Sequence, residues 1–182
     1  KHFWDKKNGG FFFSSDDGEK MLVSWKDFND GAMPSCNSVS MLNLLRLGRI
    51  TDNSKFTEMA LSISRPVSNE VSRFPAAYTH LLTAFDYGQG PSYEIVISGK
   101  ADADDTKKML KAIRNRFIPN KVLILRPAEH QSPEIARTAK FTQNQISIDG
   151  KSTAYVCQNY NCKLPTTDIN KMLGLLKIMK VS

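Results

Sequence analysis

The sequence predicts an α+β fold, with helices in the first half of the chain and a small α/β subdomain in the second. Between residues 34 and 87, three segments with apolar residues at helical spacing follow one another with short links, which is typical of packed helices. After Gly90-Pro91, a strand, an amphipathic helix and a second strand follow within about thirty residues, which predicts a βαβ unit. We therefore expect two domains, 1–90 and 91–182.

The composition favours an ordinary globular chain: 41% of the 182 residues are hydrophobic and 24% are charged. No apolar run reaches the roughly 18 residues of a membrane span, so no membrane partner is expected. The net charge of +7 lies in the second half, but its lysines are spread over helix faces without interleaved aromatic residues, so nucleic acid is not expected either. The missing initial Met and the early Gly-Gly-Phe-Phe-Phe run predict a piece of a longer protein.

In the first half of the chain, apolar segments are separated by turn-forming residues, and this pattern predicts a hairpin followed by helices. Residues 9–14 predict a short buried strand, and the alternation in Lys20–Lys26 predicts an extended partner, so we expect a hairpin. Helices are expected at about 34–49, 54–65 and 75–87. The first is apolar on nearly every side, which predicts an interior helix. If neighbouring helices are missing, the first and third helices should expose apolar flanks.

In the second half, hydrophobic runs predict a small sheet with covering helices. The strands at 93–98 and 121–125 are separated by an amphipathic helix over 102–117, so they should be parallel. Residues 133–140 are weakly helical. A third strand is expected at 153–158 and a last helix at 166–180.

A cluster of polar residues precedes the interior helix and forms the main candidate ligand site. Its members are Lys26, Asp30, Ser35, Asn37 and Ser38. Asp30 is the candidate general acid or base, because burial can tune a carboxyl group for proton transfer. The alternative is that these side chains make turn and cap hydrogen bonds to the backbone. No second carboxylate is placed beside Asp30 by spacing, so a glycosidase pair is not evident.

The three cysteines do not form a disulfide framework, and reduced thiols in the cytoplasm are the favoured expectation. Cys157 and Cys162 are interpreted as either a redox pair or structural cysteines, with Cys157 a small buried residue of a strand. Their spacing is not Cys-x-x-Cys, so thioredoxin-type chemistry is not implied. A structural zinc site requires four ligands, and no matching spacing supplies them. We therefore expect no metal and no cofactor.

Several motifs resemble the C-terminal region of the spermatogenesis-associated protein 20 family. The motifs are Gly9-Gly-Phe-Phe, Lys26, Asp30-Gly-Ala, Pro34-Ser, Asn37-Ser-Val, Asn43-Leu-Leu-Arg-Leu47, Ile118-Pro-Asn-Lys-Val-Leu-Ile-Leu125, Ala154-Tyr-Val-Cys-Gln-Asn-Tyr-Asn-Cys162, Pro165 and Asp168. Two positions depart from the pattern. Cys36 stands where the family usually has Gly or another small residue, and Ser24 stands where an Arg is common. If that Arg contacts an anionic ligand in relatives, this chain lacks the contact.

The resemblance implies a three-part parent: a thioredoxin-like domain, a six-hairpin (α/α) toroid similar to carbohydrate-processing epimerases and glycosidases, and a small C-terminal α/β piece. Residues 1–90 would be the end of the toroid, about three helices and a hairpin. The expected partners are the upstream domains of the same parent and a small sugar-like ligand. The implied roles are carbohydrate metabolism or redox regulation in spermatogenesis, and the alternative is a non-catalytic scaffold or protein-interaction domain. Because three helices cannot close a funnel, the chain alone is expected to be inactive.

Overall fold

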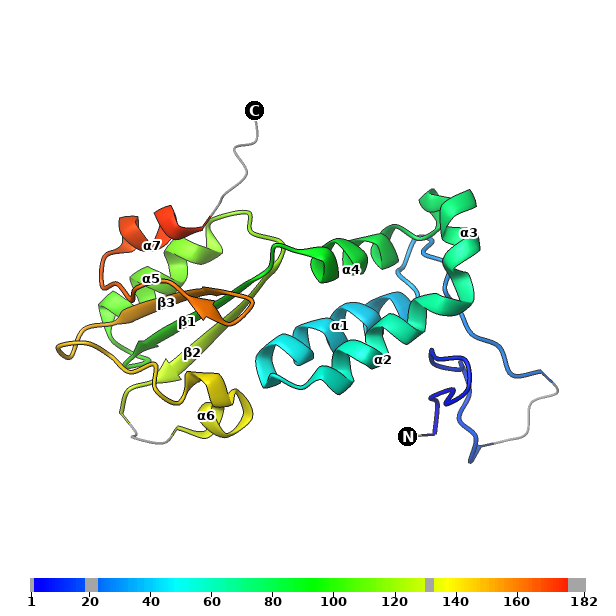
Figure 1. Cartoon of the computed structure of the whole chain (residues 1–182), viewed down its shortest axis with the longest axis horizontal. Helices are drawn as coiled ribbons and strands as arrows, with labels where there is room; N and C mark the ends of the chain where they lie inside the picture. The colour runs from blue at the N-terminus through cyan, green and yellow to red at the C-terminus, as the bar shows by residue number, and fades with distance from the viewer. Residues whose placement is uncertain (1, 19–22, 130–132, 177–182) are drawn as a thin grey trace. The chain divides into compact units, whose positions relative to one another are not determined.

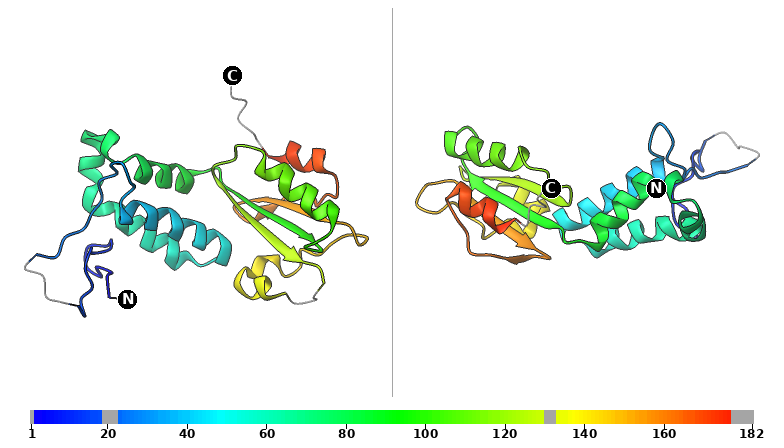
Figure 2. Two further views of the ribbon diagram at one scale, coloured as in Figure 1. Left: turned by 180° about the vertical axis from the view of Figure 1, so that it is seen from behind. Right: turned by 90° about the horizontal axis from the view of Figure 1, so that it is seen from above.

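A helical hairpin opens the regular structure of the chain. The computed structural model describes residues 2–18, 23–129 and 133–176. Helix α1 (Cys36–Thr51) and helix α2 (Ser54–Ser64) lie side by side (Figures 1 and 2). Asp52 has a φ of 53°, which a helix interior does not allow, and the Asn53 side chain accepts a hydrogen bond from the Lys55 N–H. These two residues therefore end α1 and begin α2, close to the boundaries that the sequence predicts at about residues 49 and 54.

The third predicted helix is interrupted at its start. Pro75–Ala77 forms a 3-10 turn, and helix α4 (Thr79–Gln89) begins only after Tyr78. A short helix that the sequence did not predict, α3 (Ser68–Arg73), follows α2 after the 3-10 turn Arg65–Val67. The chain forms two compact units, and these helices belong to the first, which consists of residues 1–48 and 53–89.

The core of the first unit is shared by α1, α2 and α4. Its buried apolar residues are Met41, Leu42, Leu44, Leu45, Ala60, Ile63, Val67, Leu81, Ala84 and Tyr87. Helix α1 is not enclosed on every side: Val39 is 37% exposed and Leu47 is 41% exposed. Leu82 of α4 is also 37% exposed. Both helices for which exposed apolar flanks were predicted thus carry exposed apolar residues.

The predicted N-terminal hairpin is wrong where the structure describes it. In residues 9–14 the ladder is a single bridge between Trp4 and Phe11, and the Phe13 N–H donates to the Trp25 carbonyl. Gly9 and Gly10 both have positive φ, which bends the chain where a strand must be extended. Val23 is 71% exposed, so the alternation there does not mark a buried face. The rest of the expected partner, residues 19–22, lies outside the described residues.

The second unit, residues 49–52 and 90–182, contains a mixed sheet. Its strands are β1 (Tyr93–Gly99), β2 (Lys121–Pro127), β3 (Thr153–Gln158) and β4 (Asn161–Cys162), in the order β2-β1-β3-β4. β1 and β2 are parallel, as predicted, but β3 is antiparallel to β1 and to β4. The prediction of a parallel subdomain is therefore correct only for the βαβ unit. The apolar pattern of β3 predicts its burial and carries no information about its direction.

Helices cover both faces of this sheet (Figures 1 and 2). Helices α5 (Asp104–Arg114) and α7 (Ile169–Leu175) lie on one face, where Met109, Ile113 and Met172 pack on the strands. Helix α6 (Glu134–Thr138) and the 3-10 turn Lys140–Thr142 lie on the other. Both α5 and α7 are shorter than predicted, and residues 177–180 of the last expected helix lie outside the described residues. Two covered faces explain why every residue of β1 is buried.

Among the described residues, none of the helices has both the length and the apolar character needed to cross a membrane.

A substitution at Gly9 tests the bend that the structure has in place of the predicted strand. Gly9→Ala should lower the free energy of unfolding by about 1–3 kcal/mol, because a Cβ at φ 76° would collide with the Ser62 carbonyl group. Gly31→Ala is the matched control, since a Cβ there meets nothing within 4 Å. Trp4 and Trp25 both lie in the first unit, so tryptophan fluorescence during urea unfolding measures this effect. Equal effects of the two substitutions would contradict the bend.

Candidate functional site

The Asp30 carboxylate joins the beginnings of two helices. Its Oδ1 accepts a hydrogen bond from the Ser35 N–H at 2.9 Å, immediately before α1. Its Oδ2 accepts from the N–H groups of His80 and Leu81 at 2.8 and 3.0 Å, in the first turn of α4. The side chain is buried, at 7% exposed. Because both oxygens face the positive ends of helices, the carboxylate is held by charge-assisted bonds.

Ser35 and Ser38 form the N-terminal cap of α1. The Ser35 Oγ accepts from the Ser38 N–H at 3.1 Å and lies 2.8 Å from the Ser38 Oγ. Both residues are buried. A serine at this position satisfies a helix N–H that has no partner within the helix. The two hydroxyl groups therefore bond to each other, and the Ser35 hydroxyl also bonds to the backbone.

Asn37 fastens the N-terminal segment to the start of α1. Its Nδ2 donates to the carbonyls of Phe11 and Asp27 at 3.0 and 2.8 Å, and its Oδ1 accepts from the Phe11 N–H at 2.6 Å. The residue is 1% exposed. The amide therefore pairs with both backbone groups of Phe11, much as a neighbouring strand would.

Lys26 forms an ion pair that is largely shielded from solvent. Its Nζ lies 2.7 Å from the Asp5 Oδ2 and donates to the Gly9 carbonyl at 2.6 Å. It also lies 4.9 Å from the centre of the Phe12 ring. The Lys26 hydrogen bond, helped by the N–H groups of Asn8 and Lys7, holds the pKa of Asp5 well below its usual range. Lys26 thus stabilises the loop containing Gly9 and Gly10.

The structure therefore brings all five predicted residues into one part of the first unit, and their polar atoms bond to other atoms of that unit. This arrangement matches the cap-and-turn alternative for the cluster. A cavity of about 300 Å³ lies beside it. Its lining is mainly aromatic, and the residues are Phe3, Phe11, Phe12, Phe13, Asp27, Cys36 and Asn37. Cys36 is a free, exposed thiol at the start of α1.

Sequence reasoning missed a buried carboxylate in the second unit. Glu94 of β1 is fully buried, and it accepts from Arg49 Nη1 at 3.2 Å and from the Tyr160 N–H at 3.0 Å. Arg49 Nη1 also donates to the Asn159 Oδ1 at 2.9 Å. Burial raises the pKa of Glu94, and its two hydrogen-bond donors oppose the rise. A Glu inside a strand of otherwise buried residues was the available signal.

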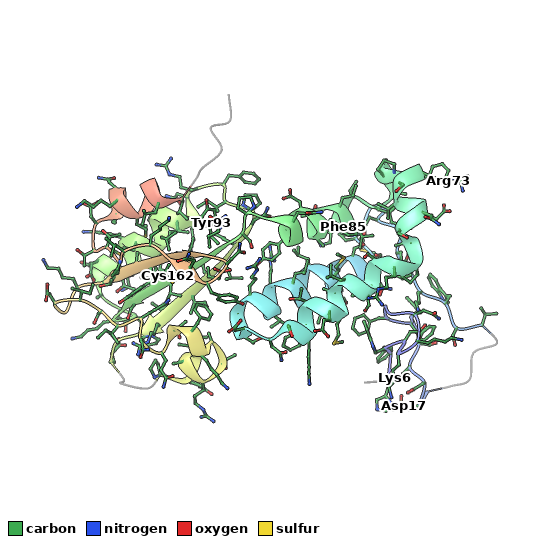
Figure 3. The ribbon with its side chains drawn as sticks, in the orientation of Figure 1. Lys6, Asp17, Arg73, Phe85, Tyr93 and Cys162 are labelled. Carbon is green, nitrogen blue, oxygen red and sulfur yellow. A yellow bond between two sulfur atoms is a disulfide. The ribbon has the colours of Figure 1, made fainter. Side chains whose placement is uncertain are left out.

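Cys157 and Cys162 form a disulfide across β3 and β4 (Figure 3, where Cys162 is labelled). Cys157 is 1% exposed, so the predicted burial is correct, but the expectation of reduced thiols is wrong for Cys157 and Cys162. The two residues are directly opposite in the antiparallel register. This adjacency comes from a two-residue turn that the sequence analysis did not place.

One group of described residues has ligand atoms close enough together to hold a metal ion: His2, Asp16 and Asp17. All three are exposed, and the His2 Nδ1 lies 2.8 Å from an Asp16 carboxylate oxygen. An exposed acidic group of this kind is common without a metal, and none of these residues belongs to the predicted cluster.

The fold and these contacts define an α+β chain of two units. In the first unit, the polar cluster connects the N-termini of α1 and α4 through hydrogen bonds. The chain is 36% identical over 177 residues to Spermatogenesis-associated protein 20 of Homo sapiens, and 35% and 33% identical to the proteins of that name in Rattus norvegicus and Mus musculus. The similarity covers 97% of the chain but 22% of each relative. The resemblance predicted from the motifs is thus confirmed: the chain is homologous to part of Spermatogenesis-associated protein 20.

The chain spans about a fifth of the length of these curated relatives, a share consistent with the predicted C-terminal fragment. No family model matches the chain. No solved structure matches it either.

The raised pKa of Glu94 predicts a pH dependence of stability. As pH rises above 4.5, the ordinary value of a Glu, the unfolded chain loses this proton while the folded chain still binds it. This group's contribution to the free energy of unfolding should therefore decrease between pH 4.5 and the higher folded pKa. Glu94→Gln should remove that decrease, as measured by urea unfolding followed by circular dichroism at several pH values. Glu58→Gln, at an exposed position of α2, is the control and should keep it. The same pH slope in both variants would show that burial of Glu94 is not its cause.

Proposed function

We propose that the chain is the C-terminal part of a longer protein like Spermatogenesis-associated protein 20, with residues 1–90 forming the end of an (α/α) toroid and 91–182 a small α/β subdomain. The α1–α2 hairpin followed by α4 supports the toroid, because such domains are built from tandem helical hairpins. The exposed apolar residues Val39, Leu47 and Leu82 support it as well, since they are suited to pack against further helices.

In this proposal, carbohydrate processing and thiol-redox regulation are activities of the whole parent. The toroid would supply the carbohydrate-type architecture, and a thioredoxin-like domain elsewhere in the parent would supply redox chemistry. The parent would act in spermatogenesis, the process named in its homologues. The present chain is proposed to be inactive alone, because a funnel needs helices from other parts of the parent.

The function that the geometry supports best for this chain is structural. The observation that carries this conclusion is the hydrogen bonding of Asp30, whose two oxygens already accept from three main-chain N–H groups. A general acid or base must reach the substrate with one oxygen. To do so, Asp30 would have to lose its hydrogen bonds to the N-terminus of α1 or of α4. We therefore propose that Asp30, with Asn37 and Ser35, holds the loop in place and is not catalytic.

A second function, binding of a small sugar-like ligand, is supported by the aromatic cavity beside the cluster. Phe11, Phe12 and Phe13 provide ring surfaces against which the apolar face of a sugar ring can pack. Asp27 also lines the cavity, and a carboxylate can accept hydrogen bonds from sugar hydroxyls. Its volume of about 300 Å³ is at the small end of ligand pockets. The parent's toroid would then use this segment for ligand contact rather than for catalysis.

The structural role of Asp30 predicts a large loss of stability on its removal. Asp30→Ala should lower the free energy of unfolding by about 3 kcal/mol, because three main-chain N–H groups lose a charged acceptor. Asp30→Asn should lower it less, because the amide oxygen can still accept. The control is Asp102→Ala, at an exposed position, with an expected change within about 0.5 kcal/mol. An active-site carboxylate is often held at a cost to stability, so an unchanged or more stable Asp30→Ala variant would contradict the structural role.

Calorimetric titration with neutral and N-acetylated monosaccharides tests the second function. Saturable binding that is weakened in Phe12→Leu and Asp27→Asn, and retained in Asp102→Asn, would support the aromatic cavity. Binding that these variants leave unchanged, or no binding at millimolar sugar, would count against it for this chain. Each variant is first checked by tryptophan fluorescence, because Trp4 packs edge-on against Phe11 at 4.9 Å and reports on this region.

A further inference from the structure

The disulfide of the second unit closes a tight hairpin whose tip is conformationally costly. Cys157 pairs with Cys162 and Gln158 pairs with Asn161, so only Asn159 and Tyr160 form the turn. Both have positive φ, 51° and 60°. A two-residue hairpin turn of type I′ has positive φ at both positions, a conformation that Asn tolerates but a bulky residue such as Tyr rarely adopts. The surrounding contacts must therefore hold Tyr160 in place.

The tip of this hairpin completes the surroundings of the buried Glu94. The Tyr160 N–H donates to one Glu94 oxygen at 3.0 Å, and the Tyr160 hydroxyl donates to the Arg49 carbonyl at 3.1 Å. The Tyr160 ring packs edge-on against Phe141 at 5.4 Å between centres. Asn159 accepts from the Arg49 side chain. A change in the hairpin would thus reach the carboxylate directly.

A buried glutamine faces the two sulfur atoms. The Gln145 Nε2 donates to Cys162 Sγ at 3.5 Å and to Cys157 Sγ at 3.8 Å. Gln145 is 7% exposed, and its Oε1 has no hydrogen-bond partner among the described residues. A disulfide has no hydrogen to donate, whereas each thiol of the reduced pair has one. If the Gln145 amide rotates by half a turn, its Oε1 faces the sulfur atoms and can accept a hydrogen bond from a thiol S–H. Gln145 can therefore hydrogen-bond to the reduced pair as well as to the disulfide.

The two cysteine residues differ in their exposure to solvent. Cys157 is 1% exposed, whereas Cys162 lies at an exposed position of β4. An incoming thiolate would therefore attack Cys162. The sulfur that leaves would be Cys157, beside the Gln145 N–H, which can donate to the thiolate that forms. Cys162 is thus the sulfur that is attacked, Cys157 is the sulfur that leaves, and the Gln145 N–H is the donor that stabilises the leaving thiolate.

We propose that Cys157–Cys162 is a reversible thiol–disulfide site that a dithiol reductant attacks at Cys162. The oxidation state of this pair controls whether the Tyr160 N–H stays hydrogen-bonded to Glu94. One thiolate of the reductant bonds to the Cys162 sulfur, and the Cys157–Cys162 bond breaks with its electron pair on Cys157, which takes up a proton. The second thiolate of the reductant then bonds to the first reductant sulfur and releases the Cys162 thiolate, which is protonated in turn. The reductant is oxidised to a disulfide, and the protein gains two thiols. The proposal concerns the second unit alone and does not depend on the proposed function.

The test follows thiols and hairpin order together, in the full chain carrying Cys36→Ser so that no third thiol contributes. Oxidised glutathione should give a chain without free thiols, and millimolar dithiothreitol at neutral pH should return two without urea. Hydrogen exchange read by mass spectrometry should then show at least a tenfold loss of protection over residues 157–163. Protection in β2 should remain, which distinguishes a local change from unfolding. Failure of the pair to oxidise, failure of dithiothreitol to reduce it in the folded chain, or unchanged protection at the hairpin would each overturn the proposal.

Two variants separate this switch from a merely structural disulfide. Replacement of both cysteines by serine, C157S together with C162S, should show the exchange pattern of the reduced chain, with the pattern of β2 unchanged. Gln145→Leu should slow reduction about three- to tenfold, because the leaving Cys157 thiolate loses its N–H donor. The matched control is Gln143→Leu, two residues away and exposed. Equal reduction rates in the two glutamine variants would remove Gln145 from the site and overturn its part in the proposal.

Discussion

The hydrogen bonds of one buried carboxylate hold the first unit together. Asp30 lies in a loop without regular structure, yet it binds the backbone just before α1 and the first turn of α4. Helix N-termini carry N–H groups without intrahelical partners and a partial positive charge, so a single carboxylate can satisfy two of them at once. Asn37 then fastens the N-terminal segment to the start of α1. The aromatic cavity depends on Asn37, because Phe11 and Asp27, which line the cavity, are held by its amide.

The second unit depends on a different constraint, the burial of β1 between two helical layers. A central strand covered on both faces has no exposed position for a charged side chain. Glu94 is therefore held in the interior by Arg49 and by the tip of the β3–β4 hairpin. The disulfide closes the same hairpin, so a redox event at the sulfurs and the electrostatics of the carboxylate involve the same few residues.

The homology to Spermatogenesis-associated protein 20 and the hydrogen bonding of the cluster bear on different questions. The homology identifies what the chain is related to, over about a fifth of the length of those relatives. The hydrogen bonding concerns what these particular residues do. A cluster that the residue types alone favour as a sugar site can equally be a set of helix caps, because Asp, Asn and Ser serve both roles. The distances around Asp30 and Asn37 favour the caps, and any ligand contact is better placed on the neighbouring phenylalanines.

The sequence by itself determined the α+β class, the positions of α1, α2, β1, β2 and β3, and the parallel pairing of β1 with β2. These follow from local periodicity and from the short βαβ connection, both of which are properties of neighbouring residues. Only the tertiary structure decided where the oxygens of Asp30 point, the antiparallel direction of β3 and the pairing of Cys157 with Cys162. Asp30 and His80 lie fifty residues apart in the chain, and no periodic pattern records which distant backbone groups a carboxylate will meet once the helices have packed.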